Sequence, residues 1–382
     1  MKQIQMLDLR REYEYMKEEI DSAIKKCLDH QKWILGPEVG ELERKIAEYI
    51  GVKHCVGISS GTDALVLALR ALAIKTKGKE YFDREDEIIT TPFTFTATGD
   101  AILRAGATPV FVDINPDTYN IDPVKIREYI SSAGPDNIVG IVPVHLYGQS
   151  CGMDEIMEIA RENDLFILED VAQAFGGKWK GKRLGAIGTA GTFSFFPSKN
   201  LGGFGDGGMV STNDDEIAEL VRMLLKHGGR DKYNVDHIGY NARLDTLQAA
   251  ILLAKFKYID EFNTKRRGIA GAYDEGFRNN DKITVPESLI DSHHVYHQYT
   301  IRVKDGKREA LQKHLHEKGV STMIYYPVPL HRMKVFGDGR CKIAGGLQNS
   351  EESTLGVISL PVEPLQSEND TAYVVDSVNK FA

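Results

Sequence analysis

The sequence predicts an α/β protein, with a mostly parallel sheet covered by helices on both faces and a smaller α+β unit at the C-terminal end. Two observations support this prediction. From residue 87 onward, short apolar runs alternate with segments of helical periodicity, which is the pattern of a parallel sheet. The chain also has 382 residues, more than one hydrophobic core usually serves. We therefore expect a large domain over residues 1–256 and a small domain over residues 257–382.

Before residue 87 we expect a helix and two loops. Apolar side chains recur at helical spacing over residues 8–30, which predicts an amphipathic helix. The loop at residues 31–37 contains Trp33, an aromatic residue that can anchor that helix. Residues 75–86 are rich in charge, so we expect a solvated surface loop there.

From residue 87 the sequence predicts strands at residues 87–90, 108–113, 137–145, 165–170 and 191–196, with helices at residues 97–104, 123–130 and 153–163. Residues 203–208 match the pattern G-x-G-x-x-G, but a dinucleotide site requires a helix directly after the last glycine. Here residues 209–212 continue as a strand and a helix starts only near residue 215. A dinucleotide site is therefore not expected.

A long helix is predicted over residues 243–262, running from the large domain into the small one. The remaining chain reads as a strand (295–303), a helix (306–318), a strand (321–325) and a terminal helix (368–381), which is an α+β pattern. Three histidines, His293, His294 and His297, stand close together, but strand alternation places His294 on the opposite face from the others. We predict no metal site.

The composition is that of an ordinary soluble protein, with 42% hydrophobic and 27% charged residues. A formal net charge of −8 argues against a general nucleic-acid-binding or anionic-membrane surface. The four cysteines are widely spaced, which disfavours structural zinc and a disulfide framework. The sequence shows neither a signal peptide nor a membrane-spanning run, so we expect a cytoplasmic protein.

One short run gives the first indication of chemistry. The apolar segment 191–196 ends at Pro197, and Lys199 is the next charged residue, between aromatic residues and a glycine-rich turn. Such surroundings remove water from a lysine, lower its pKa and leave its amine available for Schiff-base chemistry. A solvated surface lysine is the alternative interpretation.

Three further segments place ligand-binding groups after predicted strands. Asp170 ends the run 165–170, where open α/β sheets bind ligands and a carboxylate can keep a heterocyclic nitrogen protonated. Residues 59–63 begin a helix whose free N–H groups suit a phosphate, although an ordinary helix cap is the alternative. Phe93 and Phe95 offer an aromatic face for a planar ring, unless they pack in the core. Together these groups meet the needs of pyridoxal phosphate (PLP).

Four motifs in this order resemble the signature segments of a known family: S-G-T-D-A-L at 60–65, E-D-V-A-Q at 169–173, S-F-F-P-S-K at 194–199 and G-Y-N-A-R-L at 239–244. The family is DegT/StrS, whose members are PLP-dependent nucleotide-sugar aminotransferases. The resemblance covers nearly the whole chain. Family members usually have a shorter glycine-rich turn where this chain has residues 75–86, so this segment resembles an insertion. It implies an aspartate-aminotransferase-like fold, fold type I of PLP enzymes, with a mostly parallel, seven-stranded-type sheet in the large domain.

The resemblance implies a role for each motif position. Lys199 would form the Schiff base with PLP and move a proton, and Asp170 would hold the pyridine nitrogen. The other implied cofactor-binding residues are Gly61, Thr62 and Ser194 at the phosphate, Phe95 on the ring, Gln173 at the ring hydroxyl and Asn241 at the phosphate of the neighbouring subunit. The implied substrate contacts are Trp33, Arg243, Tyr325 and Tyr326.

The resemblance also implies the reaction and the partners. We expect an amino group to pass from L-glutamate to a keto group of a UDP- or dTDP-linked hexose, at C3 in our interpretation, in a homodimer with shared active sites. The product would serve surface-glycan or deoxyamino-sugar biosynthesis. The alternatives are amination at C4, a PLP-dependent sugar dehydratase and a non-catalytic PLP-binding regulator; Lys199 argues against the dehydratase, because such members have histidine there. Tyr325 also stands where many members have histidine, and a neutral phenol suits a uronic carboxylate poorly.

Overall fold

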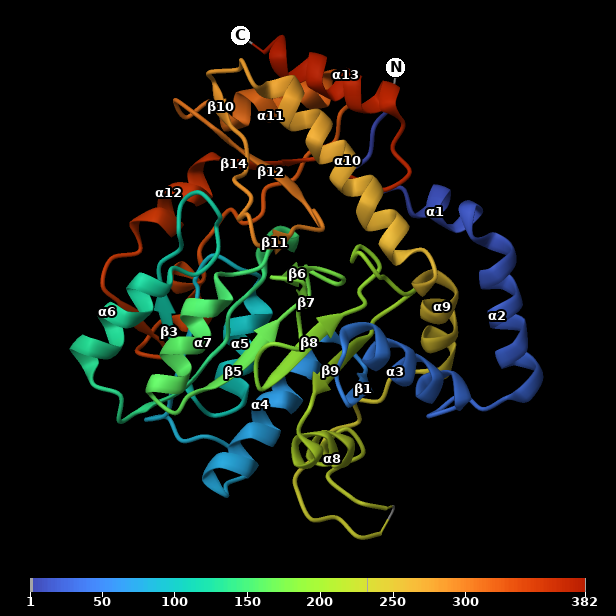
Figure 1. Cartoon of the computed structure of the whole chain (residues 1–382), viewed down its shortest axis with the longest axis vertical. Coiled ribbons are helices and arrows are strands. Elements are labelled where there is room, and N and C mark those ends of the chain that lie inside the picture. The colour runs from blue at the N-terminus through green and yellow to red at the C-terminus, as the bar shows by residue number, and fades with distance from the viewer. Residues whose placement is uncertain (1–2, 232, 382) are drawn as a thin grey trace.

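The computed structural model describes residues 3–231 and 233–381, and one large sheet forms its centre (Figure 1). Its eight strands lie in the order β1-β9-β8-β5-β4-β2-β3-β13. Strand β9 is antiparallel to both of its neighbours, and the other pairs in the sheet are parallel. The bounds are β1 His54–Ile58, β2 Glu87–Thr90, β3 Thr108–Val112, β4 Ile138–Ile141, β5 Phe166–Asp170, β8 Ala190–Ser194, β9 Gly208–Thr212 and β13 Lys342–Ala344. The predicted mostly parallel sheet is confirmed, with β13 as an eighth strand.

Alternate side chains of the strands face two separate hydrophobic cores, as the pleat of a strand requires. Ile89 and Ile167 belong to the core on one face, whereas Ile88 and Leu168 belong to the core on the other. The first face is covered by α3 Pro37–Ile50, α6 Pro123–Ala133, α7 Met153–Glu162 and α9 Thr246–Phe256. The second is covered by α4 Gly61–Lys77, α5 Thr96–Arg104 and α8 Asp215–Leu224.

A second unit, with its own hydrophobic core, lies at the top of Figure 1 near both chain ends. Its sheet has the order β10-β12-β14, and a third small sheet has the order β11-β6-β7. The remaining bounds are α1 Leu9–Tyr15, α2 Lys17–His30, β6 Lys178–Trp179, β7 Lys182–Arg183, α10 Ile259–Phe277, β10 Ile283–Thr284, β11 Ser292–His293, β12 Tyr299–Val303, α11 Arg308–Glu317, α12 Gln348–Gly356, β14 Val357–Leu360 and α13 Glu368–Asn379. The division into domains at residues 256 and 257 stays a prediction.

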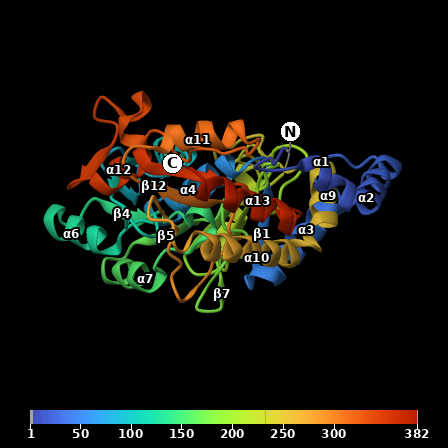
Figure 2. The same cartoon turned by 90° about the horizontal axis from the view of Figure 1, so that it is seen from above.

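Two predicted helices are each divided in the structure. The helix expected over 8–30 breaks at Met16, whose backbone leaves the helical region, into α1 and α2. The helix expected over 243–262 breaks between residues 256 and 259 into α9 and α10. The break lets α9 pack on α2 and α3 while α10 packs on α13. Figures 1 and 2 both place α2 and α9 at one end of the molecule and α6 at the other.

Two local predictions are wrong in part. Residues 75–86 do not form a solvated loop throughout: residues 75–77 end α4, Phe82 and Asp86 are buried, and Phe82 stacks on Phe166 with ring centroids 5.9 Å apart. The strand expected at 321–325 is reduced to one bridge, Met323 with Ser359 of β14. Within the described ranges, no helix is long and apolar enough to cross a membrane.

Candidate active site

The two predicted catalytic residues follow neighbouring parallel strands. Asp170 is the last residue of β5, it pairs with Thr192 of β8, and Lys199 lies in the turn after β8. The carboxyl ends of parallel strands share one edge of the sheet, which brings both side chains to that edge. Burial lowers the pKa of the Lys199 amine to about 8, against the opposing charge of Asp170. The amine is therefore neutral far more often than an ordinary lysine at pH 7.

The carboxylate of Asp170 is buried and held by two donors. Its Oδ2 accepts from the Thr98 hydroxyl at 2.8 Å, and its Oδ1 accepts from the Ala172 N–H at 3.1 Å. Burial raises the pKa of Asp170, while these two bonds and the charge of Lys199 act in the opposite direction. Thr98, on the first turn of α5, is a site residue that sequence reasoning missed; its only signal is a hydroxyl three positions after Phe95.

Glu169 points to the other side of its strand and has a structural role. Its carboxylate accepts from the N–H groups of Gly185, Ile187 and Gly188 at 2.7–2.8 Å and pairs with His145 Nε2 at 3.1 Å. Burial alone would raise the pKa of Glu169, but the hydrogen bond and charge of His145, with the backbone N–H groups, lower it. The carboxylate thus fixes the loop that leads into β8.

Gln173 is oriented by two partners. Its Oε1 accepts from the Tyr147 N–H at 3.0 Å, and its Nε2 donates to the Tyr326 hydroxyl at 2.8 Å. A primary amide has two N–H hydrogens, so one remains for a ligand hydroxyl. Phe95 is 56% exposed and lies 6.4 Å from the Tyr326 ring, centroid to centroid, whereas Phe93 is fully buried. Phe95 is therefore the aromatic residue available to a planar ligand.

The predicted phosphate site joins the start of α4 to the end of β8. Ser60 caps α4 by accepting from the Asp63 N–H at 3.0 Å, and the helix begins at Gly61. A Cβ at Gly61 would stand 2.6 Å from the Ser194 Cβ, so only glycine permits this contact. The first N–H groups of a helix have no intrahelical partner, and they attract anions. Gly61, Thr62 and Ser194 thus form a cradle that suits a phosphate.

Three other predicted residues are Trp33, Asn241 and Arg243. The Arg243 side chain donates to that of Asn241 and, with Ser60 and Gln248, lines a cleft of about 530 Å³. The carbonyl of Trp33 accepts from the N–H of Thr246 at 3.0 Å, at the start of α9. Arg243 therefore lies near the start of α4, beside the predicted phosphate site.

Tyr325 and Tyr326 differ in their surroundings. The Tyr326 hydroxyl belongs to the cluster through Gln173, whereas Tyr325 is fixed through its carbonyl, which accepts from the Tyr147 hydroxyl. Both rings pack on an apolar cluster that includes Phe93. Burial raises the pKa of Tyr325, so its phenol stays neutral near pH 7.

A buried polar network supports the turn that carries Lys199. Asn200 Nδ2 donates to Asn263 Oδ1 at 2.7 Å and to the Val295 carbonyl at 3.2 Å, and its Oδ1 pairs with His297 Nδ1 at 3.1 Å. Burial and the nearby charge of Lys199 hold the pKa of His297 well below its usual value. His297 is thus a neutral hydrogen-bonding group in this network. Sequence reasoning missed the network because its members lie far apart along the chain.

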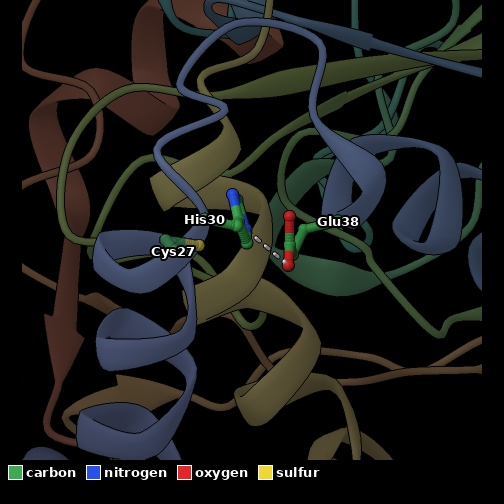
Figure 3. A group of neighbouring side chains, drawn as sticks. All are labelled: Cys27, His30 and Glu38. Carbon is green, nitrogen blue, oxygen red and sulfur yellow. Dashed lines mark hydrogen bonds and ion pairs between the residues drawn. The ribbon is translucent and has the colours of Figure 1, made fainter.

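Among the described residues, Cys27, His30 and Glu38 bring three potential metal ligands within 4.8 Å of one another (Figure 3). The Lys32 N–H donates to His30 Nδ1 at 3.0 Å, which leaves the ring proton on Nε2, directed at Glu38 Oε1 at 3.2 Å. Burial and the charge of Glu38 raise the pKa of the Cys27 thiol. The Nε2 atom of His30 therefore carries a proton toward Glu38 and offers no lone pair to a metal ion there. The absence of a metal site stays a prediction.

The cluster as a whole fits PLP: an amine of lowered pKa, a buried carboxylate, a free amide N–H, an exposed aromatic ring and a helix N-terminus for phosphate. With the mostly parallel sheet, it defines a PLP-dependent enzyme of fold type I. The chain belongs to the DegT/DnrJ/EryC1/StrS aminotransferase family, whose model matches residues 14–379.

Three relatives cover essentially the whole chain. A pleiotropic regulatory protein of Geobacillus stearothermophilus is 43% identical over 99% of this chain and 98% of its own. A dTDP-3-amino-3,6-dideoxy-alpha-D-galactopyranose transaminase of Aneurinibacillus thermoaerophilus is 42% identical over 99% of both chains. A UDP-N-acetyl-3-dehydro-alpha-D-glucosamine 3-aminotransferase of Acidithiobacillus ferrooxidans is 41% identical over 99% of this chain and 97% of its own.

Solved structures agree with the family. A DegT/DnrJ/EryC1/StrS aminotransferase of Brucella abortus superposes with a TM-score of 0.92 at 36% identity, covering 99% of both chains. NtdA of Bacillus subtilis, with its cofactor PMP bound, superposes with a TM-score of 0.88 at 31% identity, covering 99% of this chain and 85% of its own. The predicted family, fold, aminotransferase class and PLP cofactor are confirmed.

Proposed function

We propose that this protein transfers the amino group of L-glutamate to the C3 keto group of a nucleotide-linked hexose. The observation that carries the proposal is the pairing of Lys199, with its lowered pKa, and the buried Asp170 at one edge of the sheet. Relatives named as 3-amino or 3-keto sugar transaminases, with UDP- and dTDP-linked sugars, support the substrate class and leave the nucleotide open.

Each residue of the cluster has a proposed task. Bound PLP supplies an electron sink for the electrons of a broken C–H bond. Lys199 would hold the cofactor aldehyde, and its amine would move a proton between the donor carbon and the cofactor carbon. Asp170 would keep the pyridine nitrogen protonated, and Gln173 would donate to the ring hydroxyl. Phe95 would cover the ring, and Gly61, Thr62 and Ser194 would bind the phosphate.

We propose a cytoplasmic homodimer with shared sites, in which Asn241 reaches the cofactor phosphate of the neighbouring subunit and Trp33, Arg243, Tyr325 and Tyr326 border the sugar. The Asn241 side chain accepts from Arg243 and is exposed, as a residue serving a second copy would be before association. Large apolar side chains are also exposed, which favours a covering subunit; they include Ile34, Leu35, Phe196 and Phe204.

The experiment is a pair of half-reactions followed by absorption. L-Glutamate should convert the PLP form of the enzyme to the PMP form, and one member of a panel of UDP- and dTDP-linked 3-keto and 4-keto sugars should restore it. The reverse reaction, from the 3-amino sugar nucleotide and 2-oxoglutarate, checks the position of amination. Restoration by 4-keto sugars alone would move the reaction to C4.

A non-catalytic role is the second candidate, because one relative is named a regulatory protein. It requires that glutamate and all other amino donors leave the spectrum of bound PLP unchanged. A change with any donor would exclude it.

A further inference from the structure

The insertion at residues 75–86 is anchored in the large domain and reaches the segment that carries Asn241 and Arg243. Its first residues complete the last turn of α4, which is capped by Gly78 in the left-handed region with a φ of 65°. Further on, the Phe82 N–H donates to the Ala105 carbonyl at 2.9 Å, and Phe82 is buried. Between these two anchors, Glu80 and Tyr81 face residues 237–240.

Arg70, on α4, is fully buried and forms the centre of this contact. Its Nη2 donates to Glu80 Oε2 at 2.7 Å and to the Ile238 carbonyl at 3.0 Å, and its Nη1 donates to the Tyr240 hydroxyl at 3.0 Å. The Tyr81 ring covers the guanidinium at 3.7 Å from its centroid. A buried guanidinium without such partners would strongly destabilise the fold, so Arg70 favours the arrangement in which these contacts are made.

Glu80 links this arginine to the other side of the segment. Its Oε1 pairs with His237 Nδ1 at 2.6 Å, and its Oε2 also accepts from the Ile238 N–H at 3.3 Å. Burial alone would raise the pKa of Glu80, but the hydrogen bond and charge of His237, with the charge of Arg70, lower it. Glu80 therefore stays ionised and bound to both partners at neutral pH.

The chain beyond Tyr240 is fixed by backbone bonds. The Tyr240 N–H donates to the Leu224 carbonyl at 2.7 Å, and the Ala242 N–H donates to the Leu225 carbonyl at 3.1 Å. Asn241 lies between these two bonds, so its position depends on where Tyr240 is held. Arg70 holds the Tyr240 hydroxyl and the Ile238 carbonyl, and Glu80 holds His237 and the Ile238 N–H.

We propose that Glu80 is a positioning residue: through Arg70 and His237 it places residues 237–243 so that Asn241 can bind the cofactor phosphate of a second copy of this chain. The proposal rests on the proposed function of Asn241. It also assigns a role to the insertion. Residues 237–243 contain no carboxylate, and the insertion supplies one through Glu80.

The test compares Glu80→Ala, Glu80→Gln and a control, Glu85→Ala, an exposed carboxylate of the same insertion that makes none of these contacts. We expect Glu80→Ala to raise the dissociation constant of PLP about tenfold, because the loss of one charged contact worth ~1.4 kcal/mol corresponds to that factor. Turnover at saturating PLP should stay within about twofold, because the Lys199 cluster is untouched. Glu80→Gln keeps a hydrogen-bond acceptor, so its affinity for PLP should fall only about threefold.

Hydrogen exchange of the apoprotein gives a readout that does not depend on activity. Amides of residues 237–243 should exchange faster in Glu80→Ala than in Glu85→Ala. Unchanged exchange, or faster exchange with unchanged PLP affinity, would overturn the positioning role.

Asn241→Ala separates this proposal from the proposed function. If Asn241→Ala leaves PLP affinity unchanged, the shared phosphate site itself is wrong. If Asn241→Ala weakens PLP binding while Glu80→Ala does not, the shared site stands and the positioning role alone fails. If both substitutions weaken PLP binding, the double variant with Glu80→Ala and Asn241→Ala should lose no more PLP affinity than Asn241→Ala alone.

Discussion

Two regions of this protein handle charge in opposite ways. At the sheet edge, Asp170 is buried and Lys199 is partly buried; loss of water raises the pKa of Asp170 and lowers that of Lys199, which favours the neutral form of each. At the contact of the insertion with residues 237–240, Arg70 is fully buried but donates to several acceptors, and Glu80 remains ionised. The first region keeps its groups reactive, and the second keeps its groups fixed.

The comparison teaches that burial alone does not mark a catalytic group. A buried charge with full hydrogen bonding is a structural element, whereas a buried amine whose pKa approaches neutrality can take and give protons. Glu169 shows the same contrast within one strand: with three backbone donors and His145 it is structural, next in sequence to Asp170, for which we propose a catalytic role.

Lys199→Ala should give the largest effect, because it removes the group that we propose binds the cofactor aldehyde and moves the proton. We expect kcat to fall by more than about a thousandfold, while the fold is kept. Steady-state turnover measures kcat, and circular dichroism shows whether the fold is kept. Lys313→Ala, an exposed lysine on α11, is the matched control and should behave as wild type. Comparable turnover in Lys199→Ala would assign the chemistry to another lysine.

Asp170→Asn should lower kcat by about a hundredfold or more, because a neutral amide cannot stabilise a protonated ring nitrogen. PLP should still bind, since the phosphate cradle and Gln173 are unchanged. Single-turnover kinetics with L-glutamate at saturating PLP measure the chemical step. A rate equal to wild type would remove Asp170 from the mechanism and with it the contrast between the two regions.

The sheet and the main site residues could be predicted because the information is local. Apolar runs predict strands, and the residue that ends each parallel strand must lie at the shared edge, so Asp170 and Lys199 follow from sequence. The breaks at Met16 and before α10 could not be predicted, since helical periodicity continues across them and tertiary packing decides where each helix ends.

The supporting contacts could not be predicted because they join distant positions. Thr98 meets Asp170 across 72 positions, and Glu80 meets His237 across 157. Such pairs depend on how loops settle on the finished sheet, and the charges of residues 75–86 taken alone are equally consistent with a solvated loop. The role of Glu80 is visible only in three dimensions.

The pH dependence of cofactor capture tests the lowered pKa of Lys199. Only the neutral amine attacks the PLP aldehyde, so capture by the apoprotein should rise about tenfold per pH unit below pH 8 and level off above it. Asp170→Asn should move the midpoint to lower pH, because the carboxylate favours the protonated amine. Stopped-flow absorbance, with a simple primary amine as reference for the titration of PLP itself, gives the profile. A midpoint near 10.5 would show an ordinary solvated lysine.

Thr98→Val should give the smallest effect, about fivefold on kcat, because it removes one hydrogen bond to Asp170, worth ~1 kcal/mol, and leaves the Ala172 N–H in place. Thr98→Ser should restore the rate, since it returns the hydroxyl without the methyl group. A loss as large as that of Asp170→Asn would mean that the orientation of the carboxylate matters as much as its charge, and the sheet edge would then resemble the Glu80 contact. A wild-type rate would mean that the Ala172 N–H alone is enough to hold Asp170. The effect of Asp170→Asn on kcat would then come from the loss of the carboxylate charge alone.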